Sequence, residues 1–351
     1  MKAIGFFGTA KNTGKTTTVV SLTNNSLLNQ HKIGITSIGY DGEDYDNITQ
    51  LPKPKYFLPP GVVIATAEKT LKNSCLDYQV LKTSNINSAL GKILILKIKK
   101  PGYYILAGPT STSNLQIVLQ EYEKLGIDYV FVDGALNRIA PFAILDGLVM
   151  ATGAARTTNV TTLVQETKAI CSLFKMPAIN CNMPDTITLE AKKGQEVLSL
   201  KSLLTEDDGT FILKKICSTH PTRLFVPGMI TLPLLQLLNK QAREPLEIIF
   251  TDVTKLLLAG DIKKVSELLQ ESRKTIKAKV CRHIKLLGIT VNPYYPNYRH
   301  NLGDYKAAYI DKDRLLSKLA QAIDLPVVDM MHNDGIALYE IIEKELGGLQ
   351  N

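Results

Sequence analysis

The first half of the chain alternates short apolar runs with segments of helical periodicity. The apolar runs are rich in β-branched residues and end in small residues, as buried strands do. Six such runs predict strands: residues 3–8, 32–39, 61–67, 103–108, 127–134 and 148–154. Apolar residues then recur at helical spacing from residue 160 to 174. Strands that alternate with crossover helices indicate an α/β fold with a mostly parallel sheet.

Two sections depart from this alternation. Residues 77–102 predict an antiparallel hairpin with its turn at 87–91, and residues 185–220, which include TFILKKI, predict a β-rich insertion. The alternation then resumes with expected strands at 223–228, 246–252, 286–293 and 325–331. An amphipathic helix is expected around Leu315 and Leu319. We therefore expect two α/β regions, residues 1–180 and 181–351, although no linker marks the boundary.

Composition indicates a folded globular protein. The chain has 351 residues, of which 45% are apolar, and can bury a large core. No run approaches the about 18 to 20 apolar residues of a membrane span. The N-terminus enters a strand-like segment without the charge pattern of a signal peptide. We expect a soluble, cytoplasmic protein.

Charge and cysteine content exclude little by themselves. The net charge of +8 is compatible with nucleic-acid binding, but the basic residues are scattered along the chain. The five cysteines form no CxxC pair, so we expect reduced thiols and no metal role: Cys75, Cys171, Cys181, Cys217 and Cys281. The sequence also contains no HExxH and no GxSxG motif.

The stretch GTAKNTGKTTT, residues 8–18, predicts a phosphate-binding loop. It lies between a predicted strand and a predicted helix, the context such a Walker A loop requires. Its amides would surround a polyphosphate, Lys15 would reach the β and γ phosphates, and the Thr16 hydroxyl would bind Mg²⁺. The expected nucleotide contacts are Gly8, Thr9, Ala10, Lys11, Asn12, Thr13, Gly14, Lys15, Thr16 and Thr17. Thr9 stands where the usual spacing has a glycine.

Acidic residues follow two predicted strands at the sheet edge where α/β proteins bind ligands. Asp133 ends the run at 127–134, as a magnesium-side aspartate does in nucleotide hydrolases. Asp41 begins the acidic stretch of GYDGEDYDNI and is a candidate to orient the attacking water or to complete the magnesium shell. We expect Thr16, Asp133 and Asp41 on the metal side. A solvated turn explains Glu43 and the later acidic residues equally well.

Three further polar positions follow predicted strands. Arg138 and Arg156 are both candidates for an internal arginine finger, and we expect Arg156 to matter more because ATGAARTTN has the pattern of a strand-to-helix turn. Surface ion pairs are the alternative for both. The segment GPTSTSN could face an anion, but a helix cap by Ser111 or Thr112 explains it equally well.

The loop spacing GTxxxxGKT resembles dethiobiotin synthetase, and its Lys-Asn before Gly-Lys resembles the molybdopterin-guanine-dinucleotide accessory GTPases. Both belong to the SIMIBI class of P-loop proteins, which includes MinD. The resemblance implies that Asn292, which ends the strand in LLGITVNPYYP, approaches the nucleotide base, and Asn180 competes for this role. The sequence contains no NKxD motif, which favours ATP over GTP.

Five segments together resemble a narrower family: GTAKNTGKTTT, SIGYDGEDYD, PKPKYFLPPGVVIATAEKTL, YVFVDGALNR and GITVNPYYP. They are similar to the P-loop accessory protein encoded beside adenosylcobalamin-dependent lysine 5,6-aminomutase. The resemblance covers most of the chain. It implies a chaperone-like reactivase, an ATPase that works with a second ATPase subunit to exchange damaged cobalamin on the mutase. A homodimer is a further expectation.

Three functional hypotheses therefore stay open. In the first, hydrolysis of ATP with Mg²⁺ drives an action on a protein partner, with Lys15, Asp41 and Arg156 as catalytic residues. In the second, the protein is a ligase or kinase that transfers the γ-phosphoryl group to a small carboxylate, with Lys53 and Lys55 near its pocket. In the third, which no recognised motif supports, the basic balance serves nucleic-acid binding.

Overall fold

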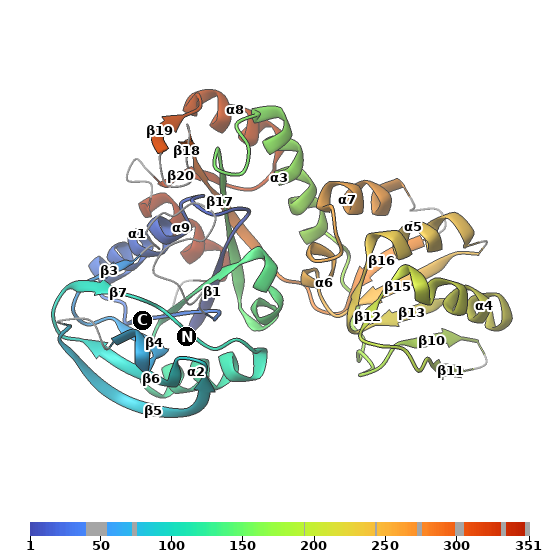
Figure 1. Ribbon diagram of the computed structural model, residues 1–351, viewed down its shortest axis with the longest axis horizontal. Coiled ribbons are helices and arrows are strands. Elements are labelled where there is room, and N and C mark those ends of the chain that lie inside the picture. The colour runs from blue at the N-terminus through green and yellow to red at the C-terminus, as the bar shows by residue number, and fades with distance from the viewer. Residues whose placement is uncertain are drawn as a thin grey trace. The chain divides into compact units, whose positions relative to one another are not determined.

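The computed structural model describes residues 1–39, 55–71, 76–192, 194–242, 244–271, 276–298, 305–330 and 335–347. The chain divides into two compact units (Figure 1). The first unit combines Met1–Val164 with Leu286–Asn351, and the second is Gln165–Lys285. None of the helices in the described ranges is both long and apolar enough to cross a bilayer.

The first unit is built on a large sheet. Among the described residues this sheet has nine strands, in the order β20 (Val327–Asp329), β17 (Leu286–Asn292), β9 (Gly147–Gly153), β1 (Lys2–Gly8), β8 (Tyr129–Ala135), β2 (Ile33–Ser37), β4 (Val63–Ala67), β6 (Gly91–Ile98) and β5 (Tyr78–Ser88). The strands from β20 to β4 are parallel, whereas β6 and β5 form the predicted antiparallel hairpin. The predicted α/β class with a mostly parallel sheet is confirmed.

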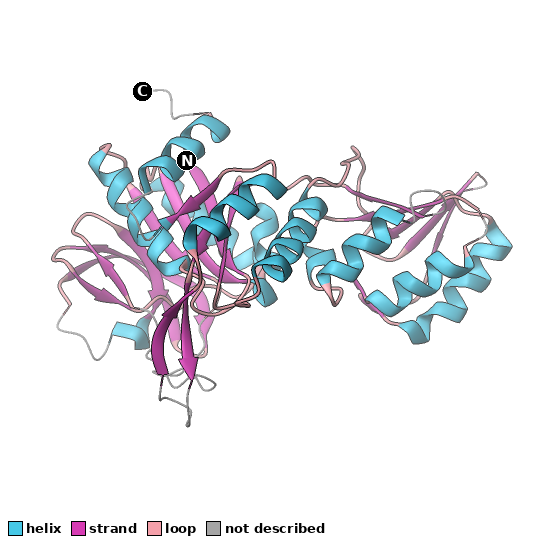
Figure 2. Cartoon of the chain, turned by 90° about the horizontal axis from the view of Figure 1, so that it is seen from above, coloured by secondary structure: helices cyan, strands magenta, loops and turns pink. Residues whose placement is uncertain are grey.

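Helices cover both faces of this sheet (Figure 2), and its central strands are therefore buried along almost their whole length. On one face, α1 (Lys15–Leu28) and α9 (Gly335–Leu346) contribute Val19, Leu22 and Leu338 to the main core. On the other face lies α2 (Thr112–Lys124), whose Tyr122 hydroxyl donates to the Ile35 carbonyl at 2.7 Å. The remaining elements of this unit are β3 (Tyr56–Leu58), β7 (Gly102–Tyr104), β18 (Tyr294–Tyr298), β19 (Tyr305–Tyr309), α8 (Lys312–Ala322) and the start of α3 (Val160–Phe174).

The second unit contains a smaller sheet with mixed strand directions. Among the described residues its order is β11 (Gly194–Val197), β10 (Thr188–Ala191), β13 (Arg223–Val226), β15 (Leu246–Phe250) and β16 (Ile276–Val280), the last three of which are parallel. The other elements are β12 (Leu203–Leu204), β14 (Met229–Ile230), α4 (Gly209–Thr219), α5 (Leu232–Gln241), α6 (Thr254–Leu257) and α7 (Ile262–Glu271). The Arg223 side chain in β13 links three neighbouring strands, because it forms ion pairs of 3.1 Å with Glu190 in β10 and with Glu247 in β15. Hydrogen bonds from Lys279 and Arg223 lower the pKa of Glu247.

The division of the chain differs from the expected one at 180/181. The second unit is an insertion, and the chain leaves it at Leu286 to add β17 and β20 to the first sheet. β17 pairs in parallel with β9, so a strand near the C-terminus becomes a neighbour of the N-terminal strands. Sequence periodicity identified both strands but carries no information about which sheet each one joins.

Two predicted strands are wrong. TFILKKI lies in α4, because Thr205 and Asp208 form a capping box that starts the helical segment directly before it. In the run at 103–108 only the first two residues lie in a strand, β7, which pairs with β3 outside the main sheet. The residues that follow are held by a side chain instead, since the Thr66 hydroxyl donates to the Ile105 carbonyl at 3.0 Å and accepts from the Ala107 amide at 2.9 Å.

The expectation of reduced thiols is wrong for two cysteines. Cys181 and Cys281 form a disulfide across 100 residues of sequence. They meet because the segment after α3 runs beside β16, where the Ile179 amide donates to the Val280 carbonyl at 2.8 Å. Burial raises the pKa of the Cys171 thiol to about 12. Cys217 is exposed, and Cys75 lies outside the described residues. Disulfides are rare in reducing compartments, so the cytoplasmic location stays a prediction.

The disulfide closes nearly the whole second unit into a covalent loop, and its removal should destabilise that unit. A loop of about 100 residues corresponds to a loss of about 4.7 kcal/mol in the free energy of unfolding. We expect urea unfolding of the Cys181→Ser/Cys281→Ser variant to show this loss, with faster amide exchange confined to 165–285. Cys217→Ser is the matched control and should match the native protein. Equal stability of the double variant and the control would contradict the expectation.

Candidate nucleotide-binding site

The turn between β1 and α1 has the backbone shape of a phosphate cradle. Asn12 and Gly14 both have left-handed φ angles, 62° and 88°, and α1 starts directly afterwards at Lys15. Glycine adopts this φ without the steric cost of a Cβ, which explains the Gly-Lys pair at the helix start. The first turn of α1 contains no acidic residue and its N-cap has no side-chain hydrogen bond. Its amides are therefore suited to receive an anion.

Threonine side chains fasten this turn to the sheet. The Thr9 amide donates to the Ala151 carbonyl at 3.0 Å, and the Thr9 and Thr152 hydroxyls are 2.9 Å apart. Inside the turn, the buried Thr13 hydroxyl donates to the Ala10 carbonyl at 3.0 Å. One turn into α1, the Thr18 hydroxyl is 3.2 Å from that of Thr290 in β17. The turn is thus held by β9 and β17, which follow one another on the same side of β1 in the sheet.

The Lys15 side chain crosses from the helix start to the end of β8. Its Nζ forms an ion pair with Asp133 and donates to the Gly134 carbonyl at 2.7 Å. The pairing of β1 with β8 makes this contact possible, since Phe6 lies opposite Asp133 in the register. Only 11% of the Asp133 side chain is exposed, against 24% for Lys15. Burial raises the pKa of Asp133, and the neighbouring Lys15 ammonium opposes part of that rise.

The predicted magnesium-side residues are only partly brought together. Thr16 follows Lys15 in the first turn of α1, and Asp133 lies near the end of β8, where Lys15 contacts it. A buried carboxylate whose ionised form is disfavoured fits a position beside a divalent cation, which would stabilise that form. Asp41 lies outside the described residues. Among the residues that are described, no group of three or more His, Cys, Asp and Glu side chains could hold a metal by itself.

Both candidate arginines lie in the first unit. Arg156 is exposed, and its amide donates to the Gly153 carbonyl at 2.9 Å in the turn after β9. Arg138 is half-buried beside the end of β2, because its Nη1 would lie 3.2 Å from a Cβ added to Gly39. The structure thus places Arg138 beside Gly39, just after β2, and Arg156 just after β9, the strand that anchors Thr9.

The two candidate asparagines belong to different units. Asn292 is buried at the end of β17, and its side-chain amide contacts the phosphate loop through the Asn12 carbonyl at 3.0 Å. Asn180 is exposed and belongs to the second unit.

Ser111 has a structural role, since its hydroxyl caps α2 by accepting from the Asn114 amide at 3.2 Å. Neither its position nor its bonding requires an anion.

Sequence reasoning missed the residues that support the loop from the neighbouring strands. These are Thr152 and Thr290, both fully buried, and Gly153, where a Cβ would lie 2.0 Å from the Asn292 carbonyl oxygen. The available signal was a hydroxyl within an otherwise apolar central strand. Such a residue has to find a hydrogen-bond partner when it is buried, and here both partners lie on the N-terminal segment.

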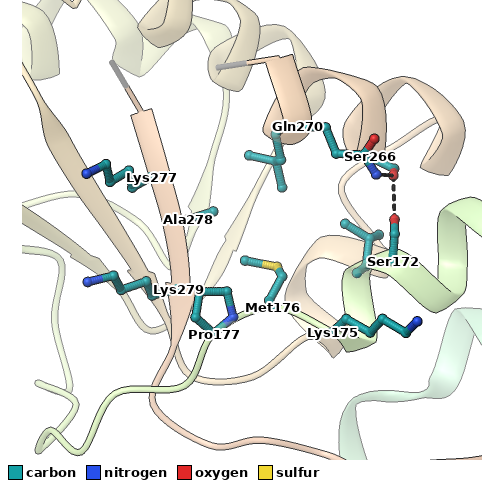
Figure 3. A pocket seen from close by; sticks show the side chains of 11 residues that line it. Ser172, Lys175, Met176, Pro177, Ser266, Gln270, Lys277, Ala278 and Lys279 are labelled. Carbon is teal, nitrogen blue, oxygen red and sulfur yellow. Dashed lines mark hydrogen bonds between the residues drawn. The ribbon is translucent and has the colours of Figure 1, made fainter. Parts of the chain in front are cut away.

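A pocket of about 550 Å³ lies within the second unit, and it contains none of the predicted site residues. It is bounded by the end of α3, by α7 and by β16, with Leu173, Met176 and Leu269 among its apolar lining residues. Ser172 and Ser266 form a hydroxyl contact of 2.6 Å at its wall. Lys277 and Lys279 point to the side of β16 away from Met176 (Figure 3).

No model of a protein family matches the chain, and no curated protein matches it. Among solved structures, the chain is similar to the MinC:MinD cell division protein complex of Aquifex aeolicus, with 9% identity and a TM-score of 0.28 over 100% of this chain and 98% of that chain. It is also similar to pNOB8 ParA, with 10% identity and a TM-score of 0.27 over 62% of this chain and 74% of that chain. Similarities this low do not identify a function.

Proposed function

We propose that the protein binds and hydrolyses ATP with Mg²⁺ at the loop formed by residues 8–17. The observation that carries this proposal is the contact between Lys15 and Asp133. A lysine at a helix start after a left-handed glycine, and an aspartate at the end of the adjacent parallel strand, are the two side chains that a phosphate and its magnesium require. Here they come from separate parts of the sequence and meet at one edge of the sheet.

In the proposed site each residue has a role set by its position. The loop amides and the start of α1 would bind phosphate oxygens, and Lys15 would move from Asp133 to the β and γ phosphates. Thr16 and Asp133 would hold the magnesium ion, which supplies positive charge to the phosphate oxygens. Catalysis would then consist of positioning and charge neutralisation rather than covalent chemistry. Asp41 and Arg156 remain the proposed water-side and phosphate-side groups.

The ion pair also suggests how the negative charge of Asp133 is compensated in the protein without a ligand. Asp133 is costly to bury as an anion, and without a ligand Lys15 is the cation that offsets this cost. With a nucleotide bound, Lys15 would turn from Asp133 to the phosphates, and Asp133 would then hold the accompanying magnesium ion. The charge of Asp133 would therefore be compensated by Lys15 before binding and by magnesium after it.

A protein partner is the further part of the proposal. The sequence resemblance supports a reactivase for a cobalamin-dependent aminomutase, which would act with a second ATPase subunit. The test is a turnover assay with purified mutase. Hydrolysis that the mutase stimulates without a small acceptor would support the partner role. Strict dependence on a small carboxylate would support the ligase or kinase hypothesis instead.

The loss of Lys15 should abolish nucleotide binding. In native protein, ATP with Mg²⁺ at one hundred times its Kd should stabilise the fold by about 2.7 kcal/mol, because only the folded state binds it. We expect Lys15→Ala to show little or no such stabilisation in thermal-shift titrations. Lys124→Ala removes an exposed lysine on α2 and is the matched control. Equal shifts in native protein and Lys15→Ala would contradict the assignment.

Asp133 should make the stability of the free protein depend on pH. Its folded-state pKa is raised, so the folded protein holds this proton more tightly than the unfolded chain does. The free energy of unfolding should then fall as pH rises from the unfolded value, about 3.9, through the folded pKa. We expect urea unfolding from pH 4 to 7 to show that Asp133→Asn lacks this component. The variant should also lose magnesium-dependent ATP binding, and parallel pH curves for the two proteins would contradict the argument.

Replacement of Arg156 should separate binding from hydrolysis. If its guanidinium stabilises charge on the transferring phosphate, Arg156→Ala should lower kcat by about 10³-fold or more and leave the ATP Kd nearly unchanged. Arg138→Ala is the comparison variant, because Arg138 lies at the other candidate position. Normal turnover by Arg156→Ala would remove it from the site.

A further inference from the structure

Asn292 connects the phosphate loop to two other segments of the first unit. Its side chain bonds to Asn12 in the loop and to Tyr294 at the start of β18, and its carbonyl accepts from the Ala154 amide at 2.9 Å. We propose that Asn292 is a positioning residue that holds the phosphate loop in its nucleotide-binding shape. The part of this inference that concerns affinity rests on the proposed function.

Both ends of the Asn292 side-chain amide are occupied. Nδ2 donates to the Asn12 carbonyl at 3.0 Å, and Oδ1 accepts from the Tyr294 amide at 3.0 Å. A flipped amide would set a donor against a donor and an acceptor against an acceptor, so the two partners determine its orientation. The residue is only 6% exposed. Each of these atoms keeps one further hydrogen-bonding position, but the two existing bonds set the plane of the amide by the loop and the start of β18.

Asn292 acts on the part of the loop that is hardest to form. Asn12 has a left-handed φ of 62°, a conformation that residues other than glycine adopt reluctantly. The bond from Asn292 fixes the carbonyl of this same residue. The Asn292 Cβ would also lie 3.4 Å from a Cβ added to Gly14, the other left-handed residue of the turn. The side chain therefore bonds to one of the two backbone positions that turn the chain toward α1 and lies beside the other.

The backbone of Asn292 is itself immobilised. β17 pairs with β9 up to the register Asn292 with Gly153, where there is no room for a Cβ between the chains. The same strand β9 accepts the Thr9 amide through Ala151. The start of the loop is thus bonded to β9, which pairs with β17. Asn292 is the side chain that reaches from β17 to the middle of the loop.

Amide hydrogen exchange without any nucleotide tests the positioning role directly. We expect Asn292→Ala to exchange at least about fivefold faster at the amides of residues 9–16, with exchange in β4, β6 and the second unit unchanged. Asn292→Leu keeps a similar volume beside Gly14 but lacks both polar atoms, and it serves if the alanine variant does not fold. Asn297→Ala, an exposed asparagine on β18, is the matched control. Unchanged exchange at 9–16 would overturn the inference.

Binding of two ligands separates positioning from base recognition. ATP and inorganic tripolyphosphate share the phosphate chain, but only ATP has a base. If Asn292 positions the loop, Asn292→Ala should raise the Kd of ATP and the Kd of tripolyphosphate by a similar factor, about tenfold. A factor of ten corresponds to the contribution of one hydrogen bond. In ATP hydrolysis the weaker binding should appear as a higher KM, and kcat at saturating ATP should stay within about twofold of the native value. Weakening of ATP alone, or a fall in kcat with unchanged KM, would overturn the inference.

The two experiments also distinguish this inference from the proposed function. If native protein binds neither ATP nor tripolyphosphate, the proposed function fails, and the exchange experiment still decides whether Asn292 holds the loop. If native protein binds both ligands and Asn292→Ala binds them equally well, the proposed function survives and the positioning role is overturned.

Discussion

The site depends on one constraint, the burial of a carboxylate at the end of a parallel strand. Asp133 has little contact with water, and Lys15 is the cation that compensates for this. That pairing requires β1 and β8 to be neighbours in register, and it requires the chain to turn sharply enough after β1 for a helix to start at Lys15. The left-handed angles at Asn12 and Gly14 produce this turn. The fold, the loop and the charge pair are therefore parts of one arrangement.

The support of the loop comes from a distant part of the chain. After the inserted second unit, the chain returns to place β17 beside β9, and this strand supplies Thr290 and Asn292 to the N-terminal segment. The disulfide between Cys181 and Cys281 joins the beginning and the end of the insertion. A domain inserted in this way leaves the surrounding sheet continuous, because its two ends already lie close together.

The proposals follow from different kinds of observation. ATP binding with Mg²⁺ follows from residue types and their contact. The positioning role of Asn292 follows from hydrogen bonds that can be measured without any ligand. The protein partner follows from a sequence resemblance, and it concerns surfaces rather than the loop. The hydrogen bonds of Asn292 can be tested whether or not ATP binds, whereas its effect on affinity and the partner role both rest on ATP binding at the loop.

The sequence by itself determined the local elements and the chemical candidates. Apolar runs of strand length, a Gly-Lys-Thr at a helix start and an aspartate at a strand end are local patterns, and local backbone preferences and burial produce them. Even at this level TFILKKI was misjudged, since the capping box before it counts for more than its β-branched residues. Tertiary structure alone decided that Lys15 contacts Asp133, that Asn292 is bonded on both sides, that Cys181 meets Cys281 and that residues 286–351 rejoin the first unit. The physical reason is that strand order and register bring together residues hundreds of positions apart, and periodicity within a strand does not encode its neighbour.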